Sequence, residues 1–414
     1  MTSPGGTAVE VFETLHRHVA PGIVLTAKLT GQGAVEADAS GAVVRLSDGR
    51  ETIDFGSYGV TLLGHRHPAV VAAVARQLGR MASTTRTLAN PVTVALMADL
   101  AHRFGPRLQR VWLGSDGADA VELAVKLARR RTRRLRVLAV RGAFHGKTLG
   151  ALALTSNPLF RAGLEPLLSH VTHIEPADAA AVAYEAARGE IAALVFEPIR
   201  AEGGVQPVEP DVLRRWAADA RAAGAYVISD EIQVGLRRCG ALSLAVEAGL
   251  DPDAVLLGKA LGGGVMPLAA MVASDDLYAP LTEDPTWHSQ TFSGHPLSCA
   301  AARAGLRAID ELSLSGARVA GRLEAGLRAV AREHPNLITG VRGRGLLWGM
   351  EFANAAAAGS VLVDMAMRGV LISPCLTAPR TIRLLPPMLT SDEQIDVVLD
   401  FLAEVVGEAT TYLA

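Results

Sequence analysis

Short apolar runs alternate with amphipathic stretches through the middle of the chain. Helical patterns lie between these runs, such as Asp211–Ala223 after Pro210. The runs predict strands that are apolar on both faces, a type that belongs in a parallel sheet covered by helices. They are Arg136–Val140, Ala192–Phe196, Ala225–Ser229 and Ala254–Leu257. The alternation predicts an α/β domain with a mainly parallel sheet.

The pattern changes near Leu306. The stretch Leu306–Glu333 predicts one long amphipathic helix, and Ser360–Arg368 predicts another helix. Leu346–Phe352 and Thr381–Leu385 predict strands. Mixed helices and strands in the last hundred or so residues indicate a smaller α+β domain.

A hairpin is predicted near the N-terminus, where Val43–Leu46 and Thr52–Phe55 flank the turn sequence Ser-Asp-Gly-Arg. A chain of 414 residues is too long for one small core. We therefore expect an N-terminal extension over residues 1–50 that joins the small domain. A large domain follows over 51–305, and the small C-terminal domain covers 306–414.

Composition adds limits to the functional class. The chain is 50% hydrophobic and 20% charged, with a net charge of −2, so nothing electrostatic favours nucleic acid or an anionic membrane. Its three cysteines are widely separated and contain no CxxC pair, which suits a reducing compartment. No signal peptide or membrane-spanning stretch is evident. We expect a cytoplasmic protein, and no metal, because His65 and His67 alone supply too few ligands.

Lysine is rare in this chain and therefore informative. Of 40 lysines and arginines together, only Lys28, Lys126, Lys147 and Lys259 are lysines. An ammonium can lose its proton and attack a carbonyl, whereas a guanidinium cannot. Lys259 follows a buried-strand pattern and precedes small residues, which suggests a site that forms a Schiff base with an aldehyde. A solvated loop lysine is the simpler reading of this residue taken alone.

Three predicted strands end in polar residues: Glu197, Asp230 and Lys259. In open α/β sheets, ligands bind outside the carboxyl ends of the strands. Each residue could merely cap a strand or the next helix, but the three together indicate a site.

A glycine-containing turn, Leu113-Gly-Ser-Asp-Gly-Ala, leads into a helix that runs to about Arg131. Free N–H groups at such a helix start can hold a phosphate, although an Asp N-cap with a tight turn also explains the motif. The amine, the carboxylate and the helix start together match the needs of pyridoxal phosphate, whose aldehyde, ring nitrogen and phosphate require them.

Several motifs resemble the class III, fold type I aminotransferases, in the family's order and over roughly residues 50–390. They are Leu63-Gly-His-Arg-His-Pro, Phe144-His-Gly-Lys-Thr-Leu-Gly-Ala-Leu, Glu197-Pro-Ile-Arg-Ala-Glu-Gly-Gly-Val, Asp230-Glu-Ile-Gln-Val-Gly, Gly258-Lys-Ala-Leu-Gly-Gly-Gly-Val-Met-Pro, Thr291-Phe-Ser-Gly-His-Pro-Leu-Ser-Cys-Ala-Ala-Ala and Ile382-Arg-Leu-Leu-Pro-Pro. The variants around Lys147 and Val265 look similar to the ω-amine branch, the putrescine and ornithine type. The resemblance implies a fold type I α/β large domain, a smaller α+β domain and pyridoxal phosphate as cofactor.

The resemblance also implies roles for single residues around the cofactor. Lys259 would form the Schiff base and move the proton, and Asp230 would pair with the ring nitrogen. Phe144 and Ile232 would cover the two faces of the ring, and Gln233 would bond its phenolic oxygen. The other implied cofactor residues are Ser115, Gly117, Ala118, His145, Glu197 and Thr291. Thr291 resembles the residue that reaches the phosphate of the neighbouring subunit, which implies a homodimer with shared active sites.

On the substrate side, Tyr58 and Lys147 match positions that touch a substrate carboxylate in ornithine- and aminobutyrate-type relatives. A structural surface role explains Lys147 equally well. Arg383 and Glu202 resemble a switchable pair in which Arg383, when released, binds the α-carboxylate. Asp116 departs from the family, because many relatives have a phosphate-binding serine there. Either it turns away as the helix cap while Ser115 serves, or cofactor affinity is reduced.

The resulting hypothesis is transfer of an amino group from an ω-amine or amino acid to a 2-oxo acid, 2-oxoglutarate or pyruvate. A decarboxylase, racemase or aminomutase with the same cofactor is the alternative. A non-catalytic protein on this fold is disfavoured by the intact set Lys259, Asp230 and Gln233. A nicotinamide dehydrogenase is disfavoured because no G-x-G-x-x-G follows a predicted strand. The sequence leaves the amine donor open.

Overall fold

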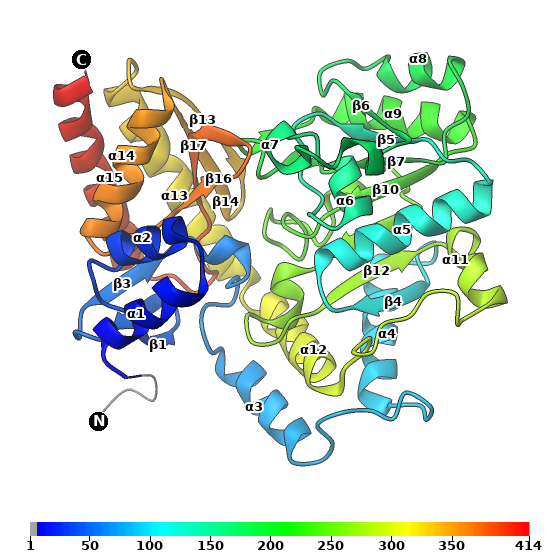
Figure 1. Cartoon of the computed structure of the whole chain (residues 1–414), viewed down its shortest axis with the longest axis horizontal. Helices are drawn as coiled ribbons and strands as arrows, with labels where there is room; N and C mark the ends of the chain where they lie inside the picture. The colour runs from blue at the N-terminus through cyan, green and yellow to red at the C-terminus, as the bar shows by residue number, and fades with distance from the viewer. Residues whose placement is uncertain (1–5, 414) are drawn as a thin grey trace. The chain divides into compact units, whose positions relative to one another are not determined.

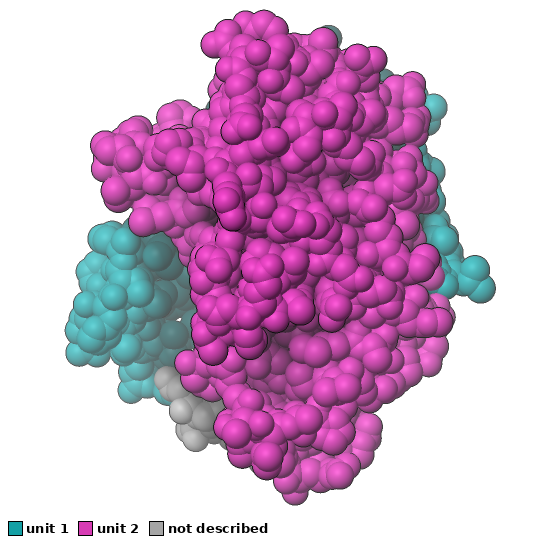
Figure 2. All heavy atoms as spheres, turned by 90° about the vertical axis from the view of Figure 1, so that its right-hand side faces the viewer, with its two compact units in different colours: residues 1–67, 312–414 teal, residues 68–311 magenta. Residues whose placement is uncertain are grey.

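The computed structural model describes residues 6–413, so residues 1–5 of the predicted N-terminal extension and Ala414 lie outside the described residues. The chain forms two compact units, which have different colours in Figure 2. Unit 1 combines the residues up to His67 with those from Leu312 onward, and unit 2 is Pro68–Glu311. The domain limits at 1–50, 51–305 and 306–414 stay a prediction, because compactness does not test whether a unit folds independently.

Unit 2 is built on a seven-stranded sheet in the order β4-β12-β11-β10-β7-β5-β6 (Figure 1). Its strands are β4 (Arg110–Gly114), β5 (Val137–Val140), β6 (Val171–Ile174), β7 (Ala193–Phe196), β10 (Tyr226–Asp230), β11 (Ala254–Leu257) and β12 (Ala269–Ala273). The pairs from β11 to β6 are all parallel, whereas β12 is antiparallel to both of its neighbours. The predicted α/β fold with a mainly parallel sheet is confirmed, and each of the four predicted strands agrees to within one residue at either end.

Helices cover both faces of this sheet. Successive strand residues point to opposite faces. Val137 and Ala139 accordingly share a core with α5 (Gly117–Thr132), α6 (Leu149–Leu154) and α11 (Asp275–Glu283). Leu138 and Val140 lie in a second core with α8 (Ala181–Ala187) and α9 (Pro210–Ala222). This two-sided burial explains why these strands are apolar at every position.

The other elements of unit 2 are α3 (Pro68–Leu78), α4 (Pro91–Phe104), α7 (Pro158–Arg161), η2 (Glu165–Leu167), β8 (Ile199–Arg200), β9 (Gln206–Pro207), α10 (Leu244–Glu247), η3 (Lys259–Gly262) and α12 (Pro296–Glu311). Helix α12 packs against α3 and α4.

The prediction of one helix over Leu306–Glu333 is wrong. The structure has two helices there, α12, which ends at Glu311, and α13 (Ser313–Glu333), with a break at Leu312. The buried positions keep helical spacing across the break, from Leu306 and Ile309 to Val319. No glycine or proline stands at the break, and the helical spacing of apolar residues does not shift there, so the sequence pattern alone could not locate it.

Unit 1 contains two four-stranded sheets. One has the order β1-β2-β3-β15, with β1 (Glu36–Ser40), β2 (Val43–Leu46), β3 (Glu51–Asp54) and β15 (Val370–Leu371). The other has the order β13-β14-β17-β16, with β13 (Ile338–Arg344), β14 (Leu347–Phe352), β16 (Ser373–Cys375) and β17 (Ala378–Leu384). The remaining elements are α1 (Ala8–His18), α2 (Pro21–Thr30), η1 (Ser57–Gly59), α13, α14 (Ala355–Met367) and α15 (Asp392–Leu413).

The predicted hairpin is present as β2 and β3, which pair antiparallel. Its turn closes through a 2.8 Å hydrogen bond from Leu46 N to Arg50 O. Gly49 has a φ of 89°, which other residues rarely adopt. Strand β15 pairs parallel with β3, so residues near the two ends of the chain share one sheet.

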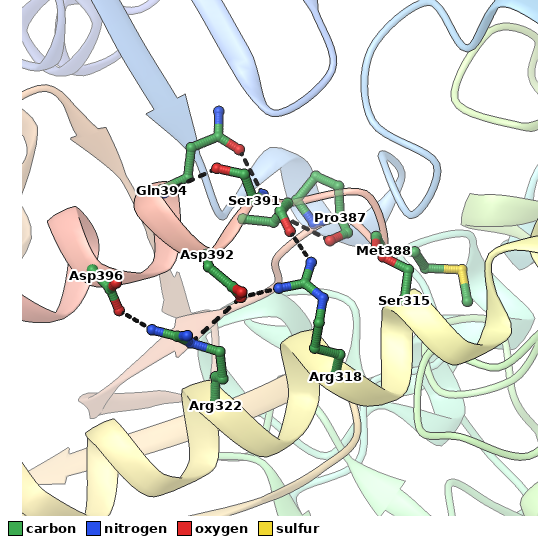
Figure 3. Close-up of polar contacts among 10 residues, drawn as sticks. Ser315, Arg318, Arg322, Pro387, Met388, Ser391, Asp392, Gln394 and Asp396 are labelled. Carbon is green, nitrogen blue, oxygen red and sulfur yellow. Dashed lines mark hydrogen bonds and ion pairs between the residues drawn. The ribbon is translucent and has the colours of Figure 1, made fainter.

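The start of α15 is held by two arginines of α13 (Figure 3). Arg318 pairs with Asp392 and donates a 2.7 Å hydrogen bond to Thr390 O. Arg322 reaches both Asp392 and Asp396. These contacts fix the segment that follows β17. Among residues 6–413, no helix is long and apolar enough to cross a membrane.

Candidate active site

The three polar strand exits lie on neighbouring strands of unit 2. Glu197 follows β7, Asp230 ends β10, and Lys259 comes two residues after β11. Since β7, β10 and β11 are parallel neighbours, their carboxyl ends meet at one edge of the sheet. The Lys259 ammonium donates a hydrogen bond to Gln233 Oε1, only three residues beyond Asp230. The amine and the carboxylate predicted from sequence are thus brought to one edge.

Asp230 is buried beside a histidine. Its Oδ2 lies 2.7 Å from His145 Nδ1, and its Oδ1 accepts a 3.2 Å bond from Ile232 N. Burial opposes a charge on His145, but the hydrogen bond and charge of Asp230, together with the charge of Glu197, raise the pKa of its imidazole above the ordinary value. The raised pKa favours the cationic form of His145, which lies beside Asp230. Sequence reasoning placed His145 in the site without this contact, which joins residues 85 positions apart.

Glu197 holds the backbone near the site. Its Oε1 accepts a 2.7 Å bond from Phe144 N, and its Oε2 accepts a 3.2 Å bond from Ala201 N. Burial raises the pKa of Glu197 to about 7, with the charge on His145 lowering it and that on Asp230 raising it. Glu197 thus fixes the turn that carries Phe144 and His145.

Helix α5 begins at the expected phosphate-binding turn. Asp116 is its N-cap and accepts a 3.2 Å bond from Asp119 N, while Asp119 accepts in return from Asp116 N. Ser115 N is 3.2 Å from both Asp119 Oδ2 and Gln290 Oε1. Asp116 is thus engaged as the helix cap, as the first of its two alternatives requires, and phosphate binding by Ser115 stays a prediction. Gly117 and Ala118 head the helix, where N–H groups have no intrahelical acceptor.

Ile232 is wedged between two glycines. A Cβ on Gly117 would lie 2.7 Å from Ile232 Cδ1, and one on Gly258 would lie 3.1 Å from Ile232 Cγ2. The start of α5 and the backbone before Lys259 can therefore approach Ile232 only because both positions are glycine. Lys259 itself has a φ of 41°, a conformation that non-glycine residues adopt at a cost and that is frequent in functional sites.

An aromatic pair lies next to these residues. Phe144 and Phe160 of α7 make an edge-to-face contact with ring centroids 6.1 Å apart. The ammonium of Lys147 lies 4.2 Å from the centroid of Phe160. Lys147 is therefore held by a cation–π contact, which the sequence had not indicated.

For the other predicted site residues, the structure gives burial and the unit to which each belongs. Glu202 is buried and Thr291 is exposed, both in unit 2. Tyr58 and Arg383 belong to unit 1, where Tyr58 is 61% exposed and Arg383 is buried and donates a 3.2 Å bond to Pro374 O. Sequence reasoning did not identify Gln290, whose side chain accepts a hydrogen bond from Ser115 N. Its position directly before Thr291, the first residue of a family motif, is the signal that could have identified it.

The residues of unit 2 fit the cofactor that the resemblance implies. Gln233 Nε2 and His145 Nε2 are buried and lack a hydrogen-bond partner within the described part of the chain. A buried amide donor beside the lysine suits a phenolic oxygen, and the carboxylate of Asp230 suits a protonated ring nitrogen. The head of α5 suits a phosphate. Across residues 6–413, no group of three His, Cys, Asp or Glu side chains could hold a metal ion.

Comparisons with known proteins identify the family of the chain. The family model for class III aminotransferases matches residues 27–406. An ornithine aminotransferase from Toxoplasma gondii, whose structure has partial occupancy of pyridoxal phosphate, is 29% identical with a TM-score of 0.88, covering 98% of this chain and 96% of that one. An (S)-enantioselective omega-transaminase from Thermomicrobium roseum is 26% identical with a TM-score of 0.87, covering 97% and 99%. An amine transaminase from an uncultivated Pseudomonas species, in a pyridoxal-phosphate-bound form, is 25% identical with a TM-score of 0.84, covering 95% and 97%.

Proposed function

Because the chain belongs to the class III aminotransferases, we propose that it moves an amino group from an ω-amine or amino acid to a 2-oxo acid such as 2-oxoglutarate or pyruvate. The enzyme is a transaminase, and its cofactor is pyridoxal phosphate. The observation that carries the assignment of residues is the contact of the Lys259 amine with Gln233 beside the buried pair of Asp230 and His145. Similarity to ornithine and omega-transaminases supports an ω-amine donor.

When bound, the cofactor supplies an aldehyde that takes up the amino group and a ring that withdraws electrons from the carbon losing its proton. Lys259 provides the amine that holds it and the base that holds and moves this proton at Nζ. Gln233 Oε1 orients the Lys259 ammonium, and Gln233 Nε2 stays available as a donor to an oxygen. Phe144 and Ile232 would cover the two sides of a planar ligand and exclude water from it.

Asp230 is proposed to bind a protonated ring nitrogen. The His145 imidazole, whose pKa is raised, lies at hydrogen-bond distance from the Asp230 carboxylate and holds it in place. The bond from Ile232 N to Asp230 Oδ1 fixes the orientation of this carboxylate. His145 therefore acts through Asp230, and Glu197 acts through the turn that carries His145.

The phosphate is proposed to bind at the head of α5, at the N–H groups of Gly117 and Ala118 and the hydroxyl of Ser115. Thr291 is exposed in its own chain, which suits a contact with a neighbouring subunit. We infer a homodimer in which Thr291 of each chain completes the phosphate site of the other.

Substrate carboxylates are proposed to contact Tyr58, Lys147 and Arg383, with Glu202 as the counter-charge of Arg383. These roles rest on the resemblance of their motifs to ornithine- and aminobutyrate-type enzymes. The three cysteines are buried. Three widely separated cysteines without a CxxC pair suit a reducing compartment, so we propose a cytoplasmic location. Nothing in the net charge favours nucleic acid or membrane as a partner.

The purified holoenzyme tests this function directly. A panel of diamines, ω-amino acids and α-amino acids is added without an oxo acid, and the absorbance band of the bound cofactor is followed. We expect the band to shift for the accepted donors and to return when 2-oxoglutarate or pyruvate is added. The Lys259→Ala protein should bind the cofactor without catalysing this cycle, and full turnover by it would contradict the proposal.

The same experiment separates transamination from other reactions of this cofactor. With an amine and no oxo acid, a transaminase stops after one equivalent per site. A decarboxylase, racemase or aminomutase continues to turn over under these conditions. Continued product formation would therefore replace the proposed reaction class and leave the cofactor site intact.

A further inference from the structure

A strained turn in unit 1 presents Tyr58 to solvent. Ser57 and Tyr58 have φ values of 41° and 51°, in the left-handed region that non-glycine residues avoid. Such conformations are unfavourable for non-glycine residues and persist only where their surroundings hold them. Tyr58 is 61% exposed, so burial of its own ring does not stabilise the turn. The turn must be held by other groups.

The carboxylate of Asp54, fully buried at the end of β3, holds this turn from within. Its Oδ1 accepts a 2.9 Å bond from Gly56 N. Its Oδ2 accepts a 2.5 Å bond from Ser57 Oγ and a 3.5 Å bond from Thr61 Oγ1, and lies 2.8 Å from His65 Nε2. One buried carboxylate thus contacts both ends of the turn and its first strained residue.

The backbone on either side of the turn is tied to the segment that follows Arg383. Leu385 N donates a 2.7 Å bond to Phe55 O, and Met388 N donates a 2.8 Å bond to Leu62 O. On the inner side, a Cβ on Gly56 would lie 2.9 Å from Ser373 Oγ.

Ser373 is also the residue that pairs with Arg383 in the β16–β17 ladder. Through Ser373, the turn that carries Tyr58 and the strand that carries Arg383 are joined inside unit 1.

We propose that Asp54 is a positioning residue that holds Tyr58 in its strained conformation beside the Arg383 strand and thereby sets the affinity for the substrate carboxylate. The inference rests on the proposed function, in which Tyr58 and Arg383 bind that carboxylate. Asp54 touches neither substrate nor cofactor and acts through the turn. A donor without a carboxylate gains nothing from it.

The test compares ornithine with putrescine, which differ only in the carboxylate, in the single half-reaction of the holoenzyme followed by absorbance. Asp54→Asn keeps an acceptor for Gly56 N but loses the one that binds Ser57, Thr61 and His65. We expect the half-saturating concentration of ornithine to rise about tenfold, because a small misplacement of a binding group is costly. The maximal rate and the values for putrescine should stay within about twofold.

Two further variants show whether Asp54 acts through Tyr58. Tyr58→Phe should raise the same concentration, and Asp54→Asn combined with Tyr58→Phe should raise it no further than the larger single effect. Asp38→Asn, an exposed change in β1 of the same unit, is the matched control and should change neither donor. Backbone amides of residues 56–62 should exchange hydrogen faster in Asp54→Asn than in the control.

If Asp54→Asn does not fold, Ser57→Ala removes one of the bonds and carries the same expectation in weaker form. Equal effects on both donors, or additive effects in the double variant, would overturn the positioning role. A wild type that reacts with putrescine and not with ornithine would overturn it as well, since no carboxylate is then recognised. A wild type that reacts with no amine would instead refute the proposed function.

Discussion

At the scale of single residues, a substitution at Gly117 tests how tightly Ile232, the side chain proposed to cover the cofactor ring, is packed. In Gly117→Ala, the new methyl group would meet Ile232 at 2.7 Å. Overpacking of this kind costs about 1–3 kcal/mol, and here it displaces the side chain proposed to cover the ring. We expect weaker retention of pyridoxal phosphate, measured by release on dialysis, and a lower melting temperature.

Gly321→Ala is the matched control, because Gly321 lies inside α13 with no atom within 4 Å of the added methyl group. This change should stabilise the protein by about 0.5–1 kcal/mol through helix propensity and leave the cofactor bound. Unchanged cofactor retention in Gly117→Ala would show that Ile232 does not cover the ring.

Glu197 gives a pH dependence of stability with a defined sign. Its pKa is raised from an ordinary 4.5 to about 7 by burial, so the folded state binds more protons than the unfolded state between these values. The contribution of Glu197 is therefore fully present below about pH 4.5 and is lost as the pH rises to about 7. Glu197→Gln should flatten this fall by on the order of 1 kcal/mol, as measured by thermal unfolding across that range.

His145 also has a raised pKa and contributes in the same direction at higher pH, so the comparison must be the difference between variant and wild type. Glu13→Gln, an exposed change on α1, serves as the control and should follow the wild-type curve. If the stability of Glu197→Gln fell with pH as it does in the wild type, the buried Glu197 carboxyl would not be the cause of that fall.

At the scale of elements, the α13–α15 contact predicts unequal effects for two arginines of one helix. Arg318 pairs with Asp392 of α15 and bonds Thr390 O, whereas Arg332 is exposed in the last turn of the same helix. Arg318→Ala should lower the free energy of unfolding by about 1–2 kcal/mol, and Arg332→Ala should change it by less than about 0.5 kcal/mol. Denaturant unfolding of both variants measures the difference, and equal losses would contradict the tertiary role of Arg318.

The elements that sequence predicted well are those whose signal is local. Strands β5, β7, β10 and β11 are apolar at every position because helices cover both faces of their sheet, and that pattern is legible in the sequence. The antiparallel direction of β12 follows from pairing with distant strands and leaves no local mark. The break at Leu312 was missed for a similar reason, since the spacing of buried residues continues through it.

In the site, too, some features could be predicted from local sequence and others depend on tertiary packing. Strand exits and the head of α5 were predictable, because a sheet of parallel strands brings its carboxyl ends together. The contact of His145 with Asp230 and that of Lys147 with Phe160 depend on tertiary packing across the fold. The role proposed for Asp54 could not be predicted either, because it depends on the positive φ values of Ser57 and Tyr58, which the sequence does not show.

At the scale of the whole molecule, shared active sites make a prediction about mixed dimers. In the proposed homodimer, Lys259 acts in its own chain and Thr291 completes the site of the neighbouring chain. Thr291→Ala homodimers should retain pyridoxal phosphate poorly, and Lys259→Ala homodimers should be inactive. In a mixed dimer, the site with an intact Lys259 also receives an intact Thr291 from its partner, while the other site lacks both.

Mixing the two variants under conditions that exchange subunits should therefore restore activity to about half that of the wild type in each mixed dimer, together with cofactor retention at the active site. Differently tagged chains allow the mixed dimers to be isolated before assay. If Thr291 served its own chain, the site with Lys259 intact would still lack Thr291, and isolated mixed dimers would show no gain over Thr291→Ala alone. The exposure of Thr291 and of the neighbouring Phe292, which is 62% exposed in the single chain, favours the first result, because a contact surface of this kind is covered only when a second copy binds.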